Sequence, residues 1–145
     1  MVTEKMYDKL AKLVVCKGAN VQKDQPVIIR ASVRDAAFVK KAAKYAYEAG
    51  ARYVSVEWHD SDLTKMAYQY ETKEVLSDMP QWKYDRTKKQ HDDGACYITI
   101  LSDMPGVIAD VDSEKIKAAN MAYFTKMSDL MGYTMNNEGQ WSVIG

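Results

Sequence analysis

The segment that follows an apolar run at residues 53–58 carries one imidazole and two carboxylates, on His59, Asp60 and Asp62. Open α/β sheets bind ligands at the carboxyl ends of their strands, where this segment is expected to lie. Nitrogen and oxygen donors of this kind can hold a divalent metal ion. A metal site needs more ligands than this loop offers, whereas Ser61 or Asp62 would be an ordinary helix cap. We therefore favour capping and keep metal binding by His59, Asp60 and Asp62 as the weaker alternative.

Two arginines, Arg30 and Arg34, flank the segment between the first expected strand and the helix after it. Guanidinium groups near a helix N-terminus could hold a small anion, although ordinary surface arginines are the commoner case. The segment, residues 30–34, has no glycine to let the backbone approach a pyrophosphate. The sequence also lacks a P-loop, so nucleotide binding is disfavoured.

Nucleophilic and zinc-dependent catalysis lack the side chains that they need. The sequence has two histidines and no HExxH motif or His/Cys cluster. His91, Asp92 and Asp93, at an expected helix end, are a weaker metal candidate than the first loop. Cys16 falls in a helical pattern and Cys96 in an apolar strand, which predicts two buried thiols rather than a disulfide or metal pair. No catalytic, cofactor-binding or metal-binding residue is therefore assigned.

The bulk composition is typical of an ordinary soluble globular domain. The 145 residues are 47% hydrophobic, and 20 basic side chains balance 20 acidic ones. Because the charges are interspersed, no net field attracts nucleic acid or an anionic membrane. No apolar run approaches the length of a membrane span or a signal sequence. We expect one domain in the cytoplasm, with no nucleic-acid or membrane partner.

A strand–helix–strand unit is expected to position the candidate residues. The apolar run Val27-Ile28-Ile29 suits a strand buried on both faces. A helix should follow, with Ser32 as its N-cap and Gly50 just past its end. Its expected apolar stripe is Ala36, Val39, Ala43 and Ala46, and the second strand should bury Val54, Val56 and Trp58. A right-handed crossover of this kind requires the two strands to be parallel.

The remaining pattern predicts further helices and strands around this unit. Helices are expected at residues 3–17, from residue 61 or 62 to 70, at 81–93 and from 113 to about 132. Thr3 should cap the first of these helices and Asp112 or Ser113 the last. A break is expected at 72–80 and a turn at 102–106. Strands are expected at 95–101 and 141–144, with a possible short one at 133–135. The expected buried side chains are Met6, Leu10, Leu13 and Val14, then Trp82, then Ile116, Ala119, Tyr123, Met127 and Leu130. The predicted fold class is α/β, an open, mostly parallel sheet of about four strands with helices on both faces.

Six ordered segments resemble one protein family. They are Gly18–Val27, Ala43–Gly50, Val56–Asp60, Asp93–Cys96, Asp110–Ile116 and Thr134–Trp141. Together they resemble the thermophilic-type metalloaminopeptidases, the group that includes aminopeptidase S, PepS and aminopeptidase T. The similarity spans essentially the whole chain, and the order of the segments makes it specific although no single segment is diagnostic.

The resemblance implies a cytoplasmic, homo-oligomeric exopeptidase that acts on peptides with two divalent metals of the zinc or cobalt type. The family's metal ligands lie in a carboxyl-terminal domain, and none can be carried onto a position of this sequence. Residues 1–145 then resemble a single amino-terminal α/β domain that is non-catalytic. Residues 133–145 would begin the connection to a missing catalytic domain, so the chain alone is expected to be a truncated, inactive fragment. The alternative is a free-standing α/β binding module for a small anion or a protein partner.

Overall fold

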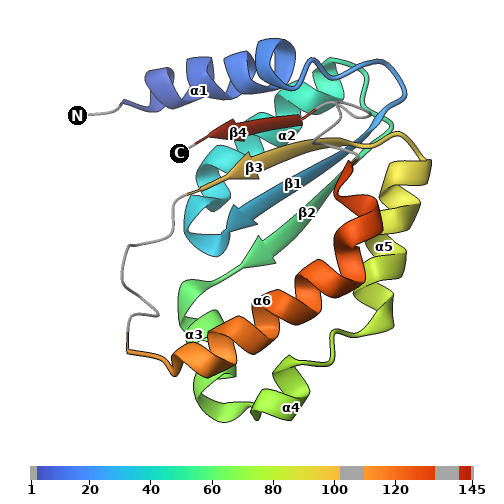
Figure 1. The fold of residues 1–145 in the computed structure, drawn as a ribbon. Helices are drawn as coiled ribbons and strands as arrows, with labels where there is room; N and C mark the ends of the chain where they lie inside the picture. Colours follow the sequence, from blue (N-terminus) through green and yellow to red (C-terminus); the bar gives the residue numbers. More distant parts are fainter. Residues whose placement is uncertain (1–2, 102–109, 133–140, 145) are drawn as a thin grey trace.

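The fold is built on a four-stranded parallel sheet (Figure 1). The computed structural model describes residues 3–101 and 110–132, and the backbone of residues 141–144. The strands β1 (Pro26–Ser32), β2 (Tyr53–His59), β3 (Cys96–Ile100) and β4 (Trp141–Ile144) lie in the order β2-β1-β3-β4. All three strand pairs are parallel. The predicted α/β class and parallel sheet are therefore confirmed, and the apolar run at Val27 lies in a central strand, as predicted.

Helices lie on both sides of the sheet (Figure 1). On one side are α1 (Glu4–Leu13), which continues as a π-helical turn (Val14–Gly18), and α2 (Ala36–Glu48), which follows a 3₁₀ turn (Val33–Asp35). On the other side are α5 (Gln81–Asp92) and α6 (Ser113–Met127), which ends in a second 3₁₀ turn (Ser128–Leu130). Helices α3 (Ser61–Tyr70) and α4 (Lys73–Leu76) follow the carboxyl end of β2 and lie beside α6. No described helix is long and apolar enough to span a membrane.

The main apolar core lies between the sheet and the pair α1 and α2. Val27 and Ile29 of β1 and Ile98 of β3 are fully buried there against the helices. The helices contribute Ala11, Val14, Val15, Val39, Ala42 and Ala46. The prediction for α1 was partly wrong, because Met6, Leu10 and Leu13 are exposed and only Val14 is buried. The buried stripe runs instead through the small and β-branched side chains at positions 11, 14 and 15.

Several predicted caps and helix ends are confirmed. Thr3 caps α1, and its hydroxyl accepts the N–H of Met6. Ser32 caps the 3₁₀ turn before α2, and Asp112 caps α6. Gly50 follows α2 with φ of 100°, a conformation that favours glycine. The predicted break at residues 72–80 was wrong in part, because Thr72 caps the short helix α4.

Large aromatic side chains are more exposed than the pattern predicted. Trp58 is exposed because β2 is the outer strand of the sheet. Trp82 is 57% exposed and lies against its own helix, where the Arg86 guanidinium carbon is 5.2 Å from its ring centroid. Tyr123 of α6 is also exposed, whereas Met127 is buried as predicted. Side-chain size was therefore a poor guide to burial at these positions.

The two thiols differ in environment. Cys96 is fully buried in β3, whereas Cys16 is exposed in the π-helical turn. The expectation of two buried thiols was wrong for Cys16, because the helix turns positions 14 and 15 toward the core and position 16 away from it. The predicted turn at residues 102–106 and the possible strand at 133–135 lie outside the described residues.

Candidate functional site

The loop residues singled out in the sequence serve the start of α3. His59 is the last residue of β2, and Asp60 is the N-cap of α3. One Asp60 carboxylate oxygen accepts the N–H of Leu63 at 3.3 Å. Asp62 is exposed in the first helical turn. Capping is thus performed in this loop by Asp60, one residue before Ser61 and two before Asp62, the two caps that were predicted.

The second candidate triplet is engaged in local ion pairs. Asp92 pairs with Lys88 at 3.0 Å and Asp93 with Lys89 at 2.9 Å, each across one turn at the end of α5. The pairing with Asp93 raises the pKa of Lys89 above its ordinary value. His91 packs edge-on against Tyr97, with the ring centroids 5.7 Å apart. These contacts make residues 91–93 a helix end that is stabilised by its own neighbours.

Arg30 and Arg34 play different parts in the structure. Arg34 is exposed in the 3₁₀ turn before α2, where its backbone N–H donates to the Ser32 hydroxyl. Arg30 lies within β1 and projects from the sheet face opposite to the main core. It lines a cavity that Arg34 does not line. The anion site considered as an alternative for Arg30 and Arg34 together is therefore not formed in this cavity.

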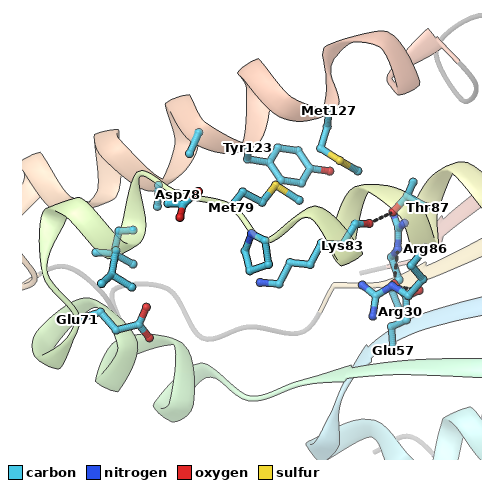
Figure 2. A pocket seen from close by; sticks show the side chains of 15 residues that line it. Arg30, Glu57, Glu71, Asp78, Met79, Lys83, Arg86, Thr87, Tyr123 and Met127 are labelled. Carbon is cyan, nitrogen blue, oxygen red and sulfur yellow. Dashed lines mark hydrogen bonds and ion pairs between the residues drawn. The ribbon is translucent and has the colours of Figure 1, made fainter.

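This cavity lies between the sheet, α4, α5 and α6 (Figure 2). Its volume is about 520 Å³, within the range of about 300–1,000 Å³ typical of small-molecule sites. A smaller cavity of about 150 Å³ adjoins it and shares Arg30, Thr87, Tyr123 and Met127. The two together extend from α4 to His91.

A charged network forms the sheet end of the cavity. The Arg30 Nε atom lies 3.1 Å from one Glu57 carboxylate oxygen. The other oxygen is 3.4 Å from the Arg86 Nε atom and accepts the Gln90 side-chain amide at 2.7 Å. Glu57 is only 16% exposed, so its carboxylate depends on these partners in place of water.

The network continues into the sheet through Gln90 and Tyr97. The Tyr97 hydroxyl donates to the Gln90 side-chain carbonyl at 2.7 Å, and both side chains are buried. The Arg30 guanidinium carbon lies 4.5 Å from the centroid of the Tyr97 ring, a cation–π arrangement. Strands β1, β2 and β3 and helix α5 thus each contribute a side chain to one connected polar network.

The rest of the cavity is apolar, with charged groups at its rim. Helices α4 and α6 and the segment before α5 supply Val75, Leu76, Met79, Pro80, Ala119, Ala122, Tyr123 and Met127. Glu71 and Asp78 lie toward the end farther from the sheet, and Lys83 projects between the two ends (Figure 2). An apolar chamber with a few convergent charged groups is the usual form of a small-ligand site.

Four residues of the polar network at the cavity were not singled out in the sequence. They are Glu57, Arg86, Gln90 and Tyr97. One signal was available. Arg30 interrupts an apolar strand, Glu57 is the charged residue on the polar face of an alternating one, and the parallel register makes the two residues Cα partners. Arg86 and Gln90 lie one helical turn apart and therefore face the same side of α5. The register itself could not be read from the sequence.

The described residues do not form a metal centre of the kind that the resemblance implies. No group of three or more His, Cys, Asp or Glu side chains that could hold a metal ion occurs among them. Glu57 is bound by two guanidinium groups and an amide, and Asp60 by a helix N-terminus. A two-metal centre therefore does not fit the described side chains, and no catalytic step through a metal is derived from them.

Comparison with known proteins agrees with the resemblance seen in the sequence. The sequence profile of the thermophilic metalloprotease (M29) family matches residues 3–145. The chain belongs to this family. It is 32% identical to aminopeptidase AmpS of Bacillus subtilis (strain 168) over 93% of the chain and 33% of that relative. It is also 32% identical to aminopeptidase 2 of Geobacillus stearothermophilus over 97% of the chain and 34% of that relative.

A solved structure shows the same relationship for this M29 chain. Wild-type AmpT from Thermus thermophilus superposes with a TM-score of 0.87 at 25% identity, over 95% of this chain and 35% of that one. The chain therefore spans about a third of the length of the curated relatives and of the solved structure that it matches. The family expectation is confirmed, and so is the α/β fold.

Proposed function

We propose that this chain is the amino-terminal, non-catalytic domain of a dinuclear-metal aminopeptidase that removes N-terminal residues from peptides. The family match over residues 3–145, in a chain about a third as long as its relatives, is the observation that carries this proposal. The described residues add that no cluster of metal-ligating side chains lies among them. The two divalent metals, of the zinc or cobalt type, would then be held by another part of the enzyme.

The proposed setting of the domain follows from the family and the charge. We place the enzyme in the cytoplasm as a homo-oligomer that acts on peptides. A formal net charge of zero gives the chain no field that would draw it to nucleic acid or to an anionic membrane. In the complete enzyme, the domain would help to enclose the peptide and restrict access to the metals.

Two measurements on the purified chain test the proposal. After dialysis against zinc or cobalt, elemental analysis should find no stoichiometric metal, and leucine p-nitroanilide should not be hydrolysed. Binding of two metal equivalents together with peptidase activity would overturn the non-catalytic assignment.

A domain exchange tests whether this chain can serve as the amino-terminal domain of an aminopeptidase. The chain is substituted for the segment that it matches in aminopeptidase AmpS of Bacillus subtilis. A folded chimera with measurable aminopeptidase activity is expected, because the two segments share sequence over almost the whole of this chain. A folded chimera that binds metal fully but has lost activity would show that the domain does not perform the proposed role.

A second candidate, a free-standing binding module, is favoured by one observation. The cavity under α5 and α6 has the size and the mixed lining of a small-ligand site. The domain exchange separates the two candidates, because a free-standing module has no reason to restore activity to an aminopeptidase.

A further inference from the structure

The sheet end of the cavity under α5 and α6 has one uncompensated positive charge. Arg30 and Arg86 lie there beside a single carboxylate, that of Glu57, and share it (Figure 2). Among the described residues, Glu57 is the only carboxylate that pairs with either guanidinium group. The Glu57 carboxylate also accepts the side-chain amide of Gln90. One further monoanion would therefore neutralise this end of the cavity.

Both guanidinium groups have donors left for such an anion. A guanidinium has five N–H donors, and Arg30 and Arg86 each approach Glu57 through Nε. Both residues line the cavity, and their side chains are 37% and 46% exposed. The Arg30 guanidinium stacks on Tyr97 and that of Arg86 on Trp82, contacts that hold the two groups in place before a ligand binds. A carboxylate is an anion whose two oxygens match the guanidinium geometry.

The wall next to the arginines is apolar. Tyr123 and Met127 lie one helical turn apart on α6, and both line this cavity and the smaller one that it adjoins at Arg30. Met79, from the segment before α5, continues the wall toward the end farther from the sheet (Figure 2). Methionine side chains adapt readily to the shape of an apolar partner. A group attached to the bound anion would therefore meet hydrocarbon.

The charges farther along the cavity disfavour a second negative group. Glu71 and Asp78 lie toward the end farther from the sheet, where they would repel another anion (Figure 2). Lys83 projects between the two ends and adds a cation on the arginine side of these carboxylates. This distribution of charge favours a ligand with one negative group, placed at the arginine end.

We propose that this cavity binds an aliphatic monocarboxylate. The ligand's carboxylate binds Arg30 and Arg86, and its hydrocarbon chain packs against Met79, Tyr123 and Met127. The ligand needs only the sheet end and the adjoining wall, and a volume of about 520 Å³ leaves room for its chain. The proposal does not depend on the proposed function, because this binding requires neither metal nor peptide. Failure of either proposal would leave the other standing.

Three ligands with the same number of carbon atoms test the charge requirement. Hexanoate, hexanamide and adipate are titrated into the ¹⁵N-labelled 145-residue chain and followed by NMR. Hexanoate should bind in the millimolar range or tighter and shift the backbone amide signals of Thr87 and Met127. Hexanamide, which lacks the charge, and adipate, which carries a second carboxylate, should each bind about tenfold more weakly. Absence of binding by hexanoate, or equal affinity for hexanamide or adipate, would overturn the proposal.

A series of chain lengths tests the apolar wall. Butanoate, hexanoate and octanoate are compared in the same titration. Each step adds two methylene groups and should raise the affinity about tenfold, because these groups are buried against the wall. An affinity that does not change with chain length would show that the hydrocarbon chain stays in solvent, and would overturn the proposal.

One variant assigns the carboxylate to its residues. Arg86→Gln removes a donor group and the uncompensated charge, so it should weaken hexanoate about tenfold and leave the affinity for hexanamide unchanged. Lys88→Gln removes the same charge from the same helix, outside the lining of the cavity, and should change neither affinity. Thermal melting verifies that both variants are folded. A folded Arg86→Gln protein with unchanged affinity for hexanoate would refute the proposal. If Arg86→Gln does not fold, the comparison of hexanoate with hexanamide in the parent chain decides.

Discussion

Arg30 and Glu57 are Cα partners in the parallel register of β1 and β2, and their side chains form a 3.1 Å ion pair on one sheet face. The pair lies under α5, which adds Arg86 and Gln90 to the same carboxylate. The opposite sheet face carries the apolar core. One face of the sheet therefore packs against its helices through apolar side chains. The other face contacts α5 through the polar network around the Glu57 carboxylate.

Replacement of the shared carboxylate should destabilise the fold. Glu57→Gln removes the negative charge that two guanidinium groups share, and its side chain is only 16% exposed. We expect a loss of about 1–3 kcal/mol in the free energy of unfolding, because partners in a mostly buried network lose a charge-assisted bond. Urea denaturation measures the change. The control is Glu48→Gln, which breaks an exposed pair with Lys44 and should cost less than about 1 kcal/mol. Equal losses for the two variants would contradict the role of the network.

The cap of α3 provides a test of what the loop after β2 does. Asp60→Ala removes the acceptor for the Leu63 N–H and should destabilise the chain by about 1 kcal/mol. Asp62→Ala, in the first turn of the same helix, should cost about 0.3–1 kcal/mol, because it loses only a favourable charge near the helix N-terminus. Thermal melts with and without zinc compare the two variants. A zinc-dependent rise in the melting temperature of the parent chain that Asp60→Ala abolishes would favour metal binding over capping.

Local sequence signals predicted the strands and several caps of this fold. Val27-Ile28-Ile29 reads as a central strand because no polar residue interrupts the run, and Thr3 and Asp112 read as caps because each precedes a helical pattern. Such features depend on near neighbours in the chain.

The cavity could not be predicted in this way, because its residues meet only after the strands are paired. Glu57 and Arg30 are 27 positions apart, and Glu57 and Gln90 are 33 positions apart. The error at Trp82 has the same origin. The pattern assumed an apolar partner beneath α5, but the sheet presents Arg30 and Tyr97 there, and α5 buries Thr87 and Gln90.

The two thiols should differ sharply in reactivity. Cys16 is exposed, whereas Cys96 is fully buried and burial raises the pKa of its thiol to about 12. Because thiolate is the reacting form, a disulfide reagent at about pH 8 should modify one thiol rapidly in the native chain and the second only after denaturation. In Cys16→Ser, the native protein should show no rapid reaction. Rapid modification of native Cys16→Ser would contradict the burial of Cys96.

Tyr45 should make the stability of the chain depend on alkaline pH. Its hydroxyl donates to the carboxylate of Asp8, and this hydrogen bond, with partial burial, raises its pKa to about 12. The folded pKa lies above the ordinary value, so the stabilisation is complete below about pH 10 and is lost as the pH rises toward 12. The difference in unfolding free energy between the parent chain and Tyr45→Phe should therefore shrink across this interval. Tyr70→Phe, at a side chain that is 84% exposed, controls for loss of a hydroxyl and should have little effect at neutral pH. A Tyr45→Phe difference that stays constant through this interval would count against the bond to Asp8.

Two glycines with positive φ permit a matched comparison of backbone strain and close contact. Gly94 has φ of 73°, and a Cβ atom placed there would meet nothing within 4 Å. Gly50 has φ of 100°, and its Cβ would lie 3.2 Å from the Cα atom of Lys23. Gly94→Ala should therefore cost only the left-handed backbone penalty, about 1–2 kcal/mol.

Gly50→Ala should cost more than Gly94→Ala, because the new methyl group must displace backbone as well as adopt an unfavourable φ. The displaced segment at Lys23 also links two elements. The N–H of the next residue, Asp24, donates to the Gly50 carbonyl and connects the end of α2 to the start of β1. Chemical denaturation of the two variants under the same conditions measures the difference. Equal losses would mean that the segment at Lys23 moves aside freely, and that the close approach of α2 to β1 is not needed to hold the first crossover in place.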